Sequence, residues 1–158
     1  MKRAFIRDTL HKAEKEDHSG ADCIFVAVLT HGNDGKLNLY AKDKPYSSDI
    51  LWKSFTSDKC PSLAGKPKIV LIQACRGRTK DLGTNVYTFV QTDSLNELRF
   101  KIPTHSDFLI ANSTLPGFVS SRNIIEGTCF IQTFVEILSK EANQTDLLTI
   151  FTRYALFY

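Results

Sequence analysis

The chain has 158 residues, 42% of them hydrophobic, and its 20 basic and 17 acidic side chains give a formal charge of +3. This length and apolar content suit one compact domain with a real core. The basic residues are spread along the whole chain and form no dense stripe, so the composition excludes an electrostatic grip on nucleic acid or on an anionic membrane.

Four cysteines, Cys23, Cys60, Cys75 and Cys129, lie far apart and show no CxxC spacing. A disulfide framework or a zinc site would need paired or clustered cysteines. We therefore expect reduced thiols, a cytoplasmic location and no metal. We also expect no signal peptide and no membrane span, because no apolar run is long enough for either.

The first part of the chain predicts a helix over residues 2–16 and a strand over residues 23–29. The strand run is nearly all apolar and rich in β-branched residues, as expected for a strand covered on both faces. A turn signal at residues 33–35 leads into residues 37–40, whose alternation predicts a small hairpin on the edge of the main sheet.

The middle of the chain predicts a short helix, a second buried strand and a long loop. Ser48 fits the N-cap of a helix over about residues 50–55. The strand covers residues 68–72. Residues 78–101 show no sustained period and are rich in Thr, Asn, Asp and Gly, which is typical of a functional or disordered loop.

The last part of the chain predicts a third strand over residues 107–111, an irregular stretch over residues 113–127 and two closing helices. One helix runs through residues 130–138, and the other begins near Thr145. Buried strands that alternate with helices indicate an α/β fold with a mostly parallel sheet flanked by helices.

Two residues with catalytic potential follow predicted strands, at the carboxyl ends where ligands of open α/β sheets bind. His31 follows the first strand and Cys75 the second. Cysteine attack on a carbonyl needs a thiolate and a proton donor for the leaving amine, and one imidazole near the thiol supplies both. Gly32 and Gly77 leave room for main-chain N–H groups to approach a substrate. The N–H groups of Gly32 and Cys75 could polarise the developing oxyanion.

Taken alone, neither residue settles the function. A cysteine at the end of an apolar strand is most often a buried core residue, and a lone histidine is most often a surface or satisfied core residue. The sequence around the two residues therefore has to decide between chemistry and structure.

That surrounding sequence resembles the caspases. Residues 73–77 (QACRG) fit the caspase nucleophile signature, and residues 29–32 (LTHG) resemble the word around the catalytic histidine. Residues 62–68 (SLAGKPK) resemble the stretch that leads into the nucleophile strand. Residues 113–118 (STLPGF) and 120–123 (SSRN) resemble the loop that forms the substrate pocket. Several motifs that follow one another in the same order as in the family argue against a chance match.

The resemblance implies a caspase-like (caspase–haemoglobinase) fold and a cysteine endopeptidase of the effector type. Such an enzyme hydrolyses protein substrates after aspartate in programmed cell death, is made as a zymogen, and uses neither metal nor cofactor. The implied catalytic residues are His31, Cys75 and Gly32.

The resemblance also implies a pocket for the substrate aspartate. Arg122 would supply a guanidinium fork that fits a carboxylate, Gln73 a neutral donor, and Ser120 main chain for pairing with an extended substrate. The implied substrate-binding positions are Gln73, Val119, Ser120, Ser121, Arg122 and Asn123.

In family terms the chain divides into three parts. Residues 1–77 correspond to the large-subunit part that carries the catalytic pair, residues 78–101 to the inter-subunit linker, and residues 102–158 to part of the small subunit. Within the linker, an upstream caspase is expected to cut after Asp93. The complete protein is expected to be a homodimer of processed subunits.

The chain departs from the family at several points. Val119, Ser121 and Cys129 stand where many members carry aromatic residues, so the outer subsites are expected to be less selective. We also expect the fold to be incomplete at both termini, because the family's first strand, its second pocket arginine and its last strand have no counterpart in this sequence.

Two other readings remain open. In one, the chain is a catalytically weak caspase homologue that binds and regulates an intact caspase. The missing ends and lost aromatics favour it, whereas retention of His31 and Cys75 opposes it. In the other, the chain is an unrelated α/β binding domain.

Overall fold

A computed structural model describes residues 1–32, 38–79, 104–115, 117–120, 122–123 and 127–156. Its centre is a parallel sheet of β1 (Ile24–Leu29), β4 (Lys68–Gln73) and β6 (Phe108–Asn112), in the order β1-β4-β6. The register pairs Ile24 with Lys68 at one end of the sheet and Ile72 with Asn112 at the other. The predicted α/β class and the three predicted strands are thus confirmed.

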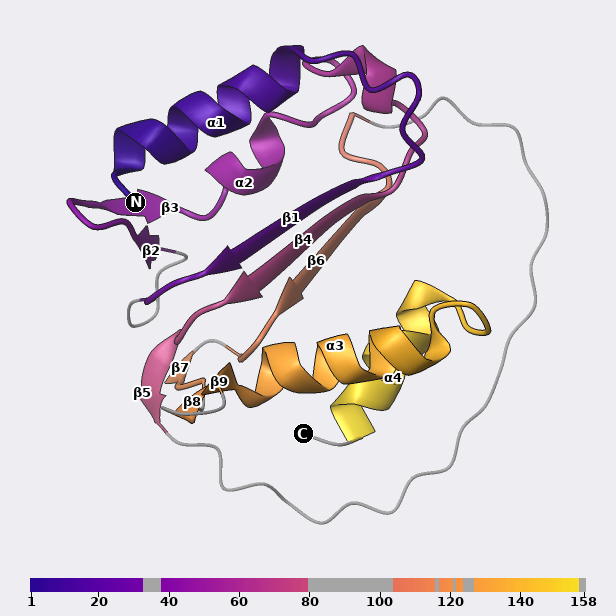
Figure 1. The fold of residues 1–158 in the computed structure, drawn as a ribbon. Helices are drawn as coiled ribbons and strands as arrows, with labels where there is room; N and C mark the ends of the chain where they lie inside the picture. Colours follow the sequence, from indigo (N-terminus) through magenta and orange to yellow (C-terminus); the bar gives the residue numbers. More distant parts are fainter. Residues whose placement is uncertain (33–37, 80–103, 116, 121, 124–126, 157–158) are drawn as a thin grey trace.

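Helices cover both faces of this sheet (Figure 1). On one side lie α1 (Arg3–Lys15) and α2 (Ile50–Lys53), and on the other lie α3 (Cys129–Glu141) and α4 (Leu147–Leu156). The predicted helices over residues 2–16, 130–138 and from about Thr145 therefore form.

The side chains of β4 feed two separate cores, because they alternate across the strand. Val70 and Ile72 join the cluster under α1 and α2, whereas Leu71 joins the cluster under α3 and α4. All six residues of β4 are buried. This agrees with the sequence pattern, since a strand covered on both faces reads as a continuous apolar run.

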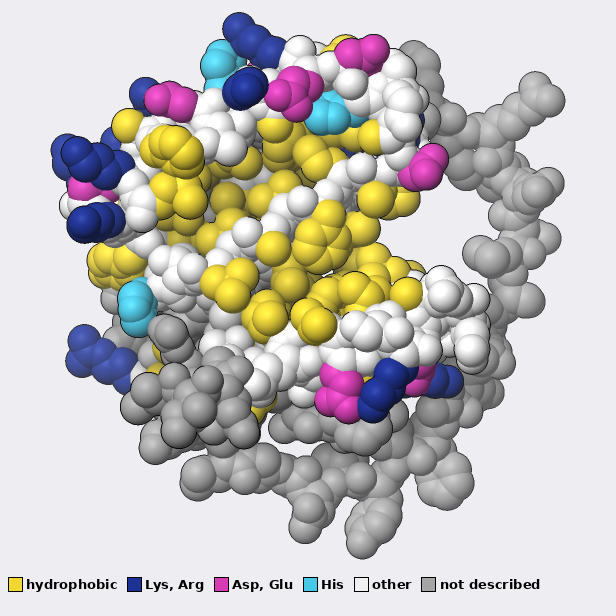
Figure 2. All heavy atoms as spheres, in the orientation of Figure 1, with side chains coloured by type: hydrophobic (Ala, Val, Ile, Leu, Met, Phe, Trp, Pro, Cys, Tyr) yellow, Lys and Arg dark blue, Asp and Glu magenta, His cyan; other side chains and the backbone are white. Residues whose placement is uncertain are grey.

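β1 differs from the prediction that both of its faces are covered. Its residues alternate between half-buried and exposed, and Phe25 and Leu29 are 45% and 60% exposed. β1 is an edge strand in the described sheet, and only Phe25 among its outward residues stacks on a helix residue, Phe134, at 6.4 Å. Figure 2 shows hydrophobic side chains gathered on this face of the molecule.

Two local predictions need correction. Ser48 does not cap the following helix: Asp49 precedes α2, and the buried Ser48 hydroxyl has no partner among the described residues. The Leu51 N–H donates instead to the Ser48 carbonyl at 3.0 Å, so main chain replaces the side-chain cap.

The predicted hairpin forms, but not on the edge of the main sheet. β2 (Asn38–Tyr40) pairs antiparallel with β3 (Pro45–Ser47) in a sheet of their own. An isolated bridge between Gly32 and Leu39 joins it to the segment that follows β1. The turn expected at residues 33–35 lies outside the described residues.

Shorter elements lie near the carboxyl edge of the sheet. β5 (Gly77–Thr79) pairs parallel with β7 (Gly117–Phe118), and β8 (Arg122–Asn123) pairs antiparallel with β9 (Gly127–Thr128). A further short element, one turn of 3-10 helix η1 (Pro61–Leu63), lies instead before the amino end of β4. The long loop expected over residues 78–101 begins inside β5, and its part from residue 80 onward is outside the described residues.

A buried lysine closes the opposite, amino end of the sheet. Lys68 is 1% exposed, and its Nζ donates to the carbonyls of Lys66 at 2.9 Å and Ser106 at 3.4 Å. The Asp107 carboxylate lies 3.9 Å away, and the ammonium sits 5.3 Å from the centre of the Phe108 ring. Buried charge is tolerated here because it is bonded and paired.

All four cysteines are free thiols, with Cys23 and Cys129 exposed and Cys60 buried. Among the described residues, no helix has the length and apolar character to cross a membrane.

Candidate active site

The carboxyl ends of β1 and β4 bring the two predicted catalytic segments to one edge of the sheet. The strands are parallel, and their pairing continues one step further, because the Thr30 N–H donates to the Gln73 carbonyl at 2.9 Å. His31 follows this bond on one strand, and Cys75 follows on the other. His31 is exposed and Cys75 is half-buried.

Gly32 lies directly against the nucleophile segment. A Cβ atom built on Gly32 would stand 1.9 Å from the Cys75 carbonyl oxygen and 3.3 Å from the Ala74 Cβ. The first distance is far below a van der Waals contact, so only glycine fits at this position. The histidine loop and the main chain of Cys75 are therefore in contact.

The histidine loop is held by the hairpin beside it. The Tyr40 N–H donates to the His31 carbonyl at 2.9 Å, and the Thr30 hydroxyl donates to the Tyr40 carbonyl at 2.6 Å. These bonds fix the main chain on both sides of His31 while its imidazole stays exposed.

Gln73 and Ser120 form a buried polar pair next to Cys75. The Gln73 side chain is 5% exposed, and its Nε2 donates to the Ser120 hydroxyl at 2.6 Å. The Gln73 Oε1 is buried and has no partner among the described residues. The Cys75 Sγ lies 3.8 Å from the Ser120 carbonyl oxygen. A buried amide with one unused end is costly unless a ligand completes it.

The segment after β6 is tied to the nucleophile segment by two further residues. The Arg76 N–H donates to the Phe118 carbonyl at 2.9 Å, and its guanidinium reaches the Thr114 carbonyl at 3.4 Å. The Ser113 hydroxyl contacts both main-chain polar groups of Ala74. The sequence did not assign a role to Arg76 or Ser113, although both lie inside the motifs that resemble the family. Their contacts join residues about forty positions apart, so no local sequence pattern indicates them.

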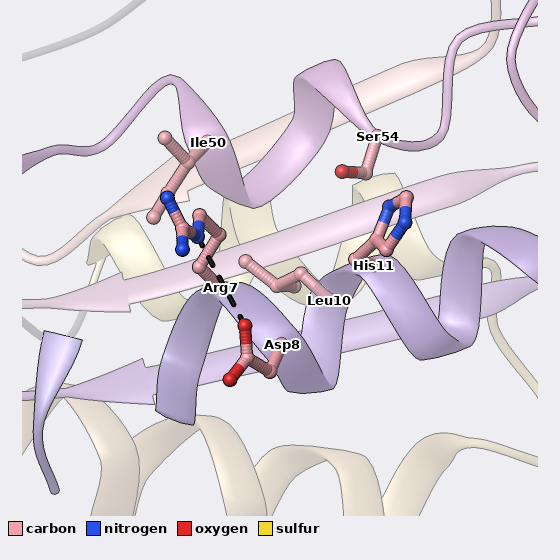
Figure 3. A pocket seen from close by; sticks show the side chains of 6 residues that line it. All are labelled: Arg7, Asp8, Leu10, His11, Ile50 and Ser54. Carbon is pink, nitrogen blue, oxygen red and sulfur yellow. Dashed lines mark ion pairs between the residues drawn. The ribbon is translucent and has the colours of Figure 1, made fainter. Parts of the chain in front are cut away.

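A larger hollow than the one beside Cys75 lies elsewhere, between α1 and α2 (Figure 3). It has a volume of about 380 Å³ and is lined by Arg7, Asp8, Leu10, His11, Ile50 and Ser54. It contains no thiol. A second, small hollow lies beside Cys75 and Arg76 at the strand ends.

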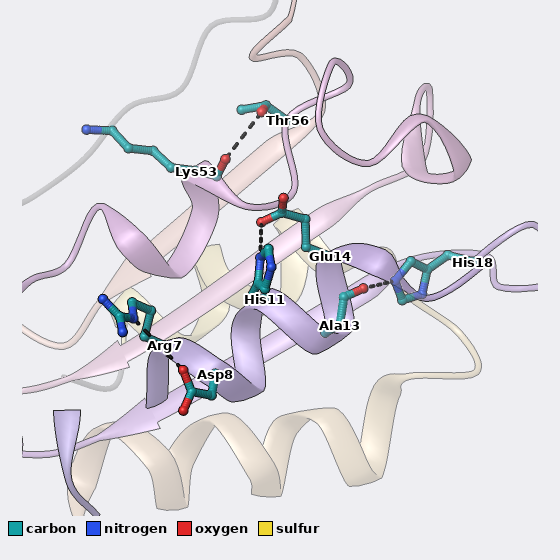
Figure 4. A network of polar contacts seen from close by, with 8 residues as sticks. All are labelled: Arg7, Asp8, His11, Ala13, Glu14, His18, Lys53 and Thr56. Carbon is teal, nitrogen blue, oxygen red and sulfur yellow. Dashed lines mark hydrogen bonds and ion pairs between the residues drawn. The ribbon is translucent and has the colours of Figure 1, made fainter. Parts of the chain in front are cut away.

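Two pairs of oppositely charged or titratable side chains lie on α1 beside the larger hollow (Figure 4). Arg7 and Asp8 are 3.9 Å apart and their side chains are 75% and 72% exposed, and His11 Nδ1 lies 3.6 Å from a Glu14 carboxylate oxygen. Exposed pairs of this kind contribute little free energy. Among the described residues, no three His, Cys, Asp or Glu side chains are grouped to hold a metal ion. The strand ends at Cys75 are therefore the stronger candidate.

Comparison with known families identifies the family of this chain. The family model of the caspase domain matches residues 1–156. The chain belongs to the caspase family. The resemblance seen in the sequence words is thus confirmed.

Individual caspases match along nearly the whole chain. Caspase-1 of Spodoptera frugiperda is 46% identical over 152 residues, which are 96% of this chain and 50% of that protein. Caspase drICE of Drosophila melanogaster is 45% identical and covers 91% of this chain and 42% of its own length. The crystal structure of Caspase-1 from Spodoptera frugiperda superposes with a TM-score of 0.85 at 44% identity, over 98% of this chain and 56% of that one.

These comparisons confirm the caspase fold. They also show that the chain spans about half the length of the curated caspases it matches.

The structure describes the implied caspase pocket only in part. Val119 is half-buried and Ser120 is buried beside Gln73. Arg122 and Asn123 form the strand β8, with Arg122 opposite Thr128. Ser121 and Asp93 lie outside the described residues, and the side chains of Arg122 and Asn123 are not described.

Proposed function

We propose that this chain carries the catalytic pair of a caspase-type cysteine endopeptidase, which hydrolyses protein substrates after aspartate in programmed cell death. Cys75 is the nucleophile and His31 is its acid and base. The contact between Gly32 and the Cys75 carbonyl is the observation that supports this most directly, because it places the histidine loop on the nucleophile segment.

In the first half of the proposed reaction, the Cys75 thiolate attacks the carbonyl carbon after the substrate aspartate. A C–S bond forms, and the carbonyl π-electrons move to oxygen. When the tetrahedral intermediate collapses, the C–N bond breaks and the leaving amine takes a proton from the His31 imidazolium. The product is a thioester on Cys75 and a free amine, as in other thiol acyl transfers.

In the second half, water attacks the thioester carbon while neutral His31 accepts one of its protons. The C–S bond breaks, the new C-terminal carboxylic acid leaves and gives the second water proton to solvent, and the thiolate and imidazolium pair is restored. Charge develops on the carbonyl oxygen in both halves. The N–H groups of Gly32 and Cys75 are the proposed donors to it, since these two residues lie against each other where the two loops meet.

Selection for aspartate is proposed to depend on Gln73, Ser120 and Arg122. If the Gln73 amide rotates so that its Oε1 accepts from the Ser120 hydroxyl, its Nε2 becomes free to donate to a carboxylate. The unused, buried end of that amide supports this role. Arg122 would neutralise the carboxylate with a planar fork of donors. Asn123, Ser121 and Val119 would complete the wall of the pocket.

Family membership extends the proposal to the complete protein. We propose that residues 1–77 form the catalytic part and residues 102–158 belong to the small-subunit part. An upstream caspase would cut the linker at residues 78–101 after Asp93, and the processed subunits would assemble as a homodimer. Four free thiols are in keeping with a cytoplasmic enzyme.

Labelling with an active-site reagent tests the proposed function. A peptide that ends in an aspartyl fluoromethyl ketone should alkylate Cys75 first, which peptide mass spectrometry locates. The matched peptide that ends in asparagine should react far more slowly, because it lacks the carboxylate. Equal labelling of Cys75 and the exposed Cys23 and Cys129 by both reagents would contradict the proposal.

A further inference from the structure

The pairing of β4 with β6 stops just before the nucleophile. Ile72 pairs with Asn112, and the Ser113 N–H donates to the Ile72 carbonyl at 3.0 Å. In a parallel pair that continued, the Ala74 N–H would donate next to the Ser113 carbonyl. β6 ends at Asn112, however, and the chain bends away from β4 at Ser113.

The Ser113 side chain provides the hydrogen-bond partner for Ala74 that the main chain of β6 would otherwise provide. Its Oγ lies 3.2 Å from the Ala74 nitrogen and 3.3 Å from the Ala74 carbonyl oxygen, so one hydroxyl accepts from the N–H and donates to the C=O. Ser113 is 5% exposed and Ala74 is 2% exposed. Buried main-chain groups need such partners because water cannot reach them.

Ala74 is thus held from two sides. The Ser113 hydroxyl binds its polar groups, and Gly32 lies against its Cβ and against the carbonyl of the next residue, Cys75. The position of the Cys75 main chain relative to Gly32 depends on both restraints. The first of them is made by a side chain, so a substitution at Ser113 can remove it.

We propose that Ser113 is a positioning residue that sets the spacing between the Gly32 and Cys75 N–H groups. This inference rests on the proposed function, in which these two groups stabilise the oxyanion. Oxyanion donors act mainly in the transition state, so a change in their spacing lowers kcat and leaves KM nearly unchanged. A displacement of about 1 Å at a reacting centre costs on the order of 100-fold in rate.

The test compares three variants of the full chain on a fluorogenic peptide that ends in aspartate. Ser113→Ala removes the hydroxyl, and Ser113→Thr keeps it. Ser57→Ala is the matched control, because the Ser57 hydroxyl is also buried but has no partner among the described residues. We expect kcat to fall by about 10- to 100-fold in Ser113→Ala with KM within about twofold. The two other variants should stay close to the unmodified chain.

Amide hydrogen exchange gives a readout that does not depend on activity. The Ala74 N–H should lose protection in Ser113→Ala and keep it in Ser57→Ala, while the Val70 and Ile72 N–H groups stay protected in both. Unchanged protection of Ala74 in Ser113→Ala would overturn the inference, whatever the activity.

The remaining outcomes separate this inference from the proposed function. If the unmodified chain cleaves the peptide and Ser113→Ala keeps its kcat, only the role of Ser113 is wrong. A parallel loss of kcat and of unfolding temperature that Ser113→Thr does not restore would also overturn it, because that pattern belongs to a merely structural residue. If the unmodified chain neither cleaves the peptide nor reacts with the aspartyl ketone, the proposed function fails first, and this inference fails with it.

Discussion

The two ends of the central sheet differ in whether their buried polar side chains have hydrogen-bond partners. At the amino end, Lys66 donates to the carbonyls of His18 and Ser19 at 2.7 and 2.9 Å, and buried Lys68 donates to two more carbonyls. At the carboxyl end, the Gln73 Oε1 is buried without a described partner, and His31 is exposed. The two lysine side chains at the amino end are thus bonded to main-chain carbonyls, whereas the buried Gln73 amide at the carboxyl end keeps one oxygen without a described partner.

This difference shows how one short sheet can serve both stability and chemistry. At the amino end, long lysine side chains donate hydrogen bonds to main-chain carbonyls, and these bonds have no role in the proposed reaction. The carboxyl end keeps polar groups that only a ligand would complete, which is the usual location of ligands in open α/β sheets. Substitutions at the two ends should therefore change different measurable quantities.

The largest expected effect is at the nucleophile. Cys75→Ala removes the thiolate that forms the acyl-enzyme, so kcat should fall by roughly 10⁴-fold or more, with the unfolding temperature little changed. Turnover of an aspartyl fluorogenic peptide measures this. Cys23→Ser is the control, because Cys23 is an exposed thiol just before β1. Retained hydrolysis in Cys75→Ala would remove this cysteine from the mechanism.

The contact between the two loops gives the next largest effect. Gly32→Ala places a Cβ where the Cys75 carbonyl oxygen already stands, so the loops must separate, and kcat/KM should fall by about 100-fold. Gly20→Ala is the matched control, since a Cβ at Gly20 meets nothing within 4 Å. Equal kcat/KM in both variants would show that the contact has no role in catalysis.

A substitution at the amino end should change stability and spare catalysis. Lys68→Met keeps the length of the side chain but leaves two part-buried carbonyls without this donor, at a cost of about 1–3 kcal/mol in the free energy of unfolding. Chemical denaturation measures this loss. Lys53→Met, at an exposed ion pair with Asp49, should cost well under about 1 kcal/mol. A lower kcat in Lys68→Met would break the division between the two ends.

The smallest effect concerns pH and lies in a helix away from both ends. The Thr149 hydroxyl and N–H lower the pKa of the Asp146 carboxyl below its ordinary 3.8, because both bind its ionised form at the start of α4. The stability that this gives is present above the unfolded pKa and is lost as pH falls through the folded one.

Asp146→Asn should therefore flatten the fall of stability below about pH 4, without changing kcat near neutral pH. Thr149→Val, which removes the hydroxyl partner of Asp146, should flatten it in the same direction. Denaturation midpoints measured across acid pH test both variants. An unchanged acid slope in Asp146→Asn would show that the carboxylate contributes nothing.

Much of the fold could be predicted because its signals are local. Three apolar runs gave β1, β4 and β6, and helical periodicity gave α1, α3 and α4. The open face of β1 could not be predicted, because a continuous apolar run does not say which neighbours cover it. The cap at Ser48 failed because the main-chain carbonyl of that residue served instead.

The candidate site could be predicted where short sequence motifs mark it. QACRG and LTHG pointed to Cys75 and His31, and the structure brings Cys75 together with Gly32, Gln73 and Ser120. Their chemical roles stay predictions. The hydroxyl of Ser113 could not be found from the sequence, because its bonds join residues 39 positions apart.

The central, buried position of β4 in the sheet determines when the surroundings of the Cys75 thiol open during unfolding. This strand is paired on both sides and buried along its whole length. Segments of that kind lose their hydrogen-exchange protection only when the whole domain opens. Cys75, two residues beyond its end, should therefore keep its native surroundings through partial melting of the surface helices. A thiol-specific pulse along a denaturant series would see Cys23 react throughout and Cys75 change its rate only at global unfolding.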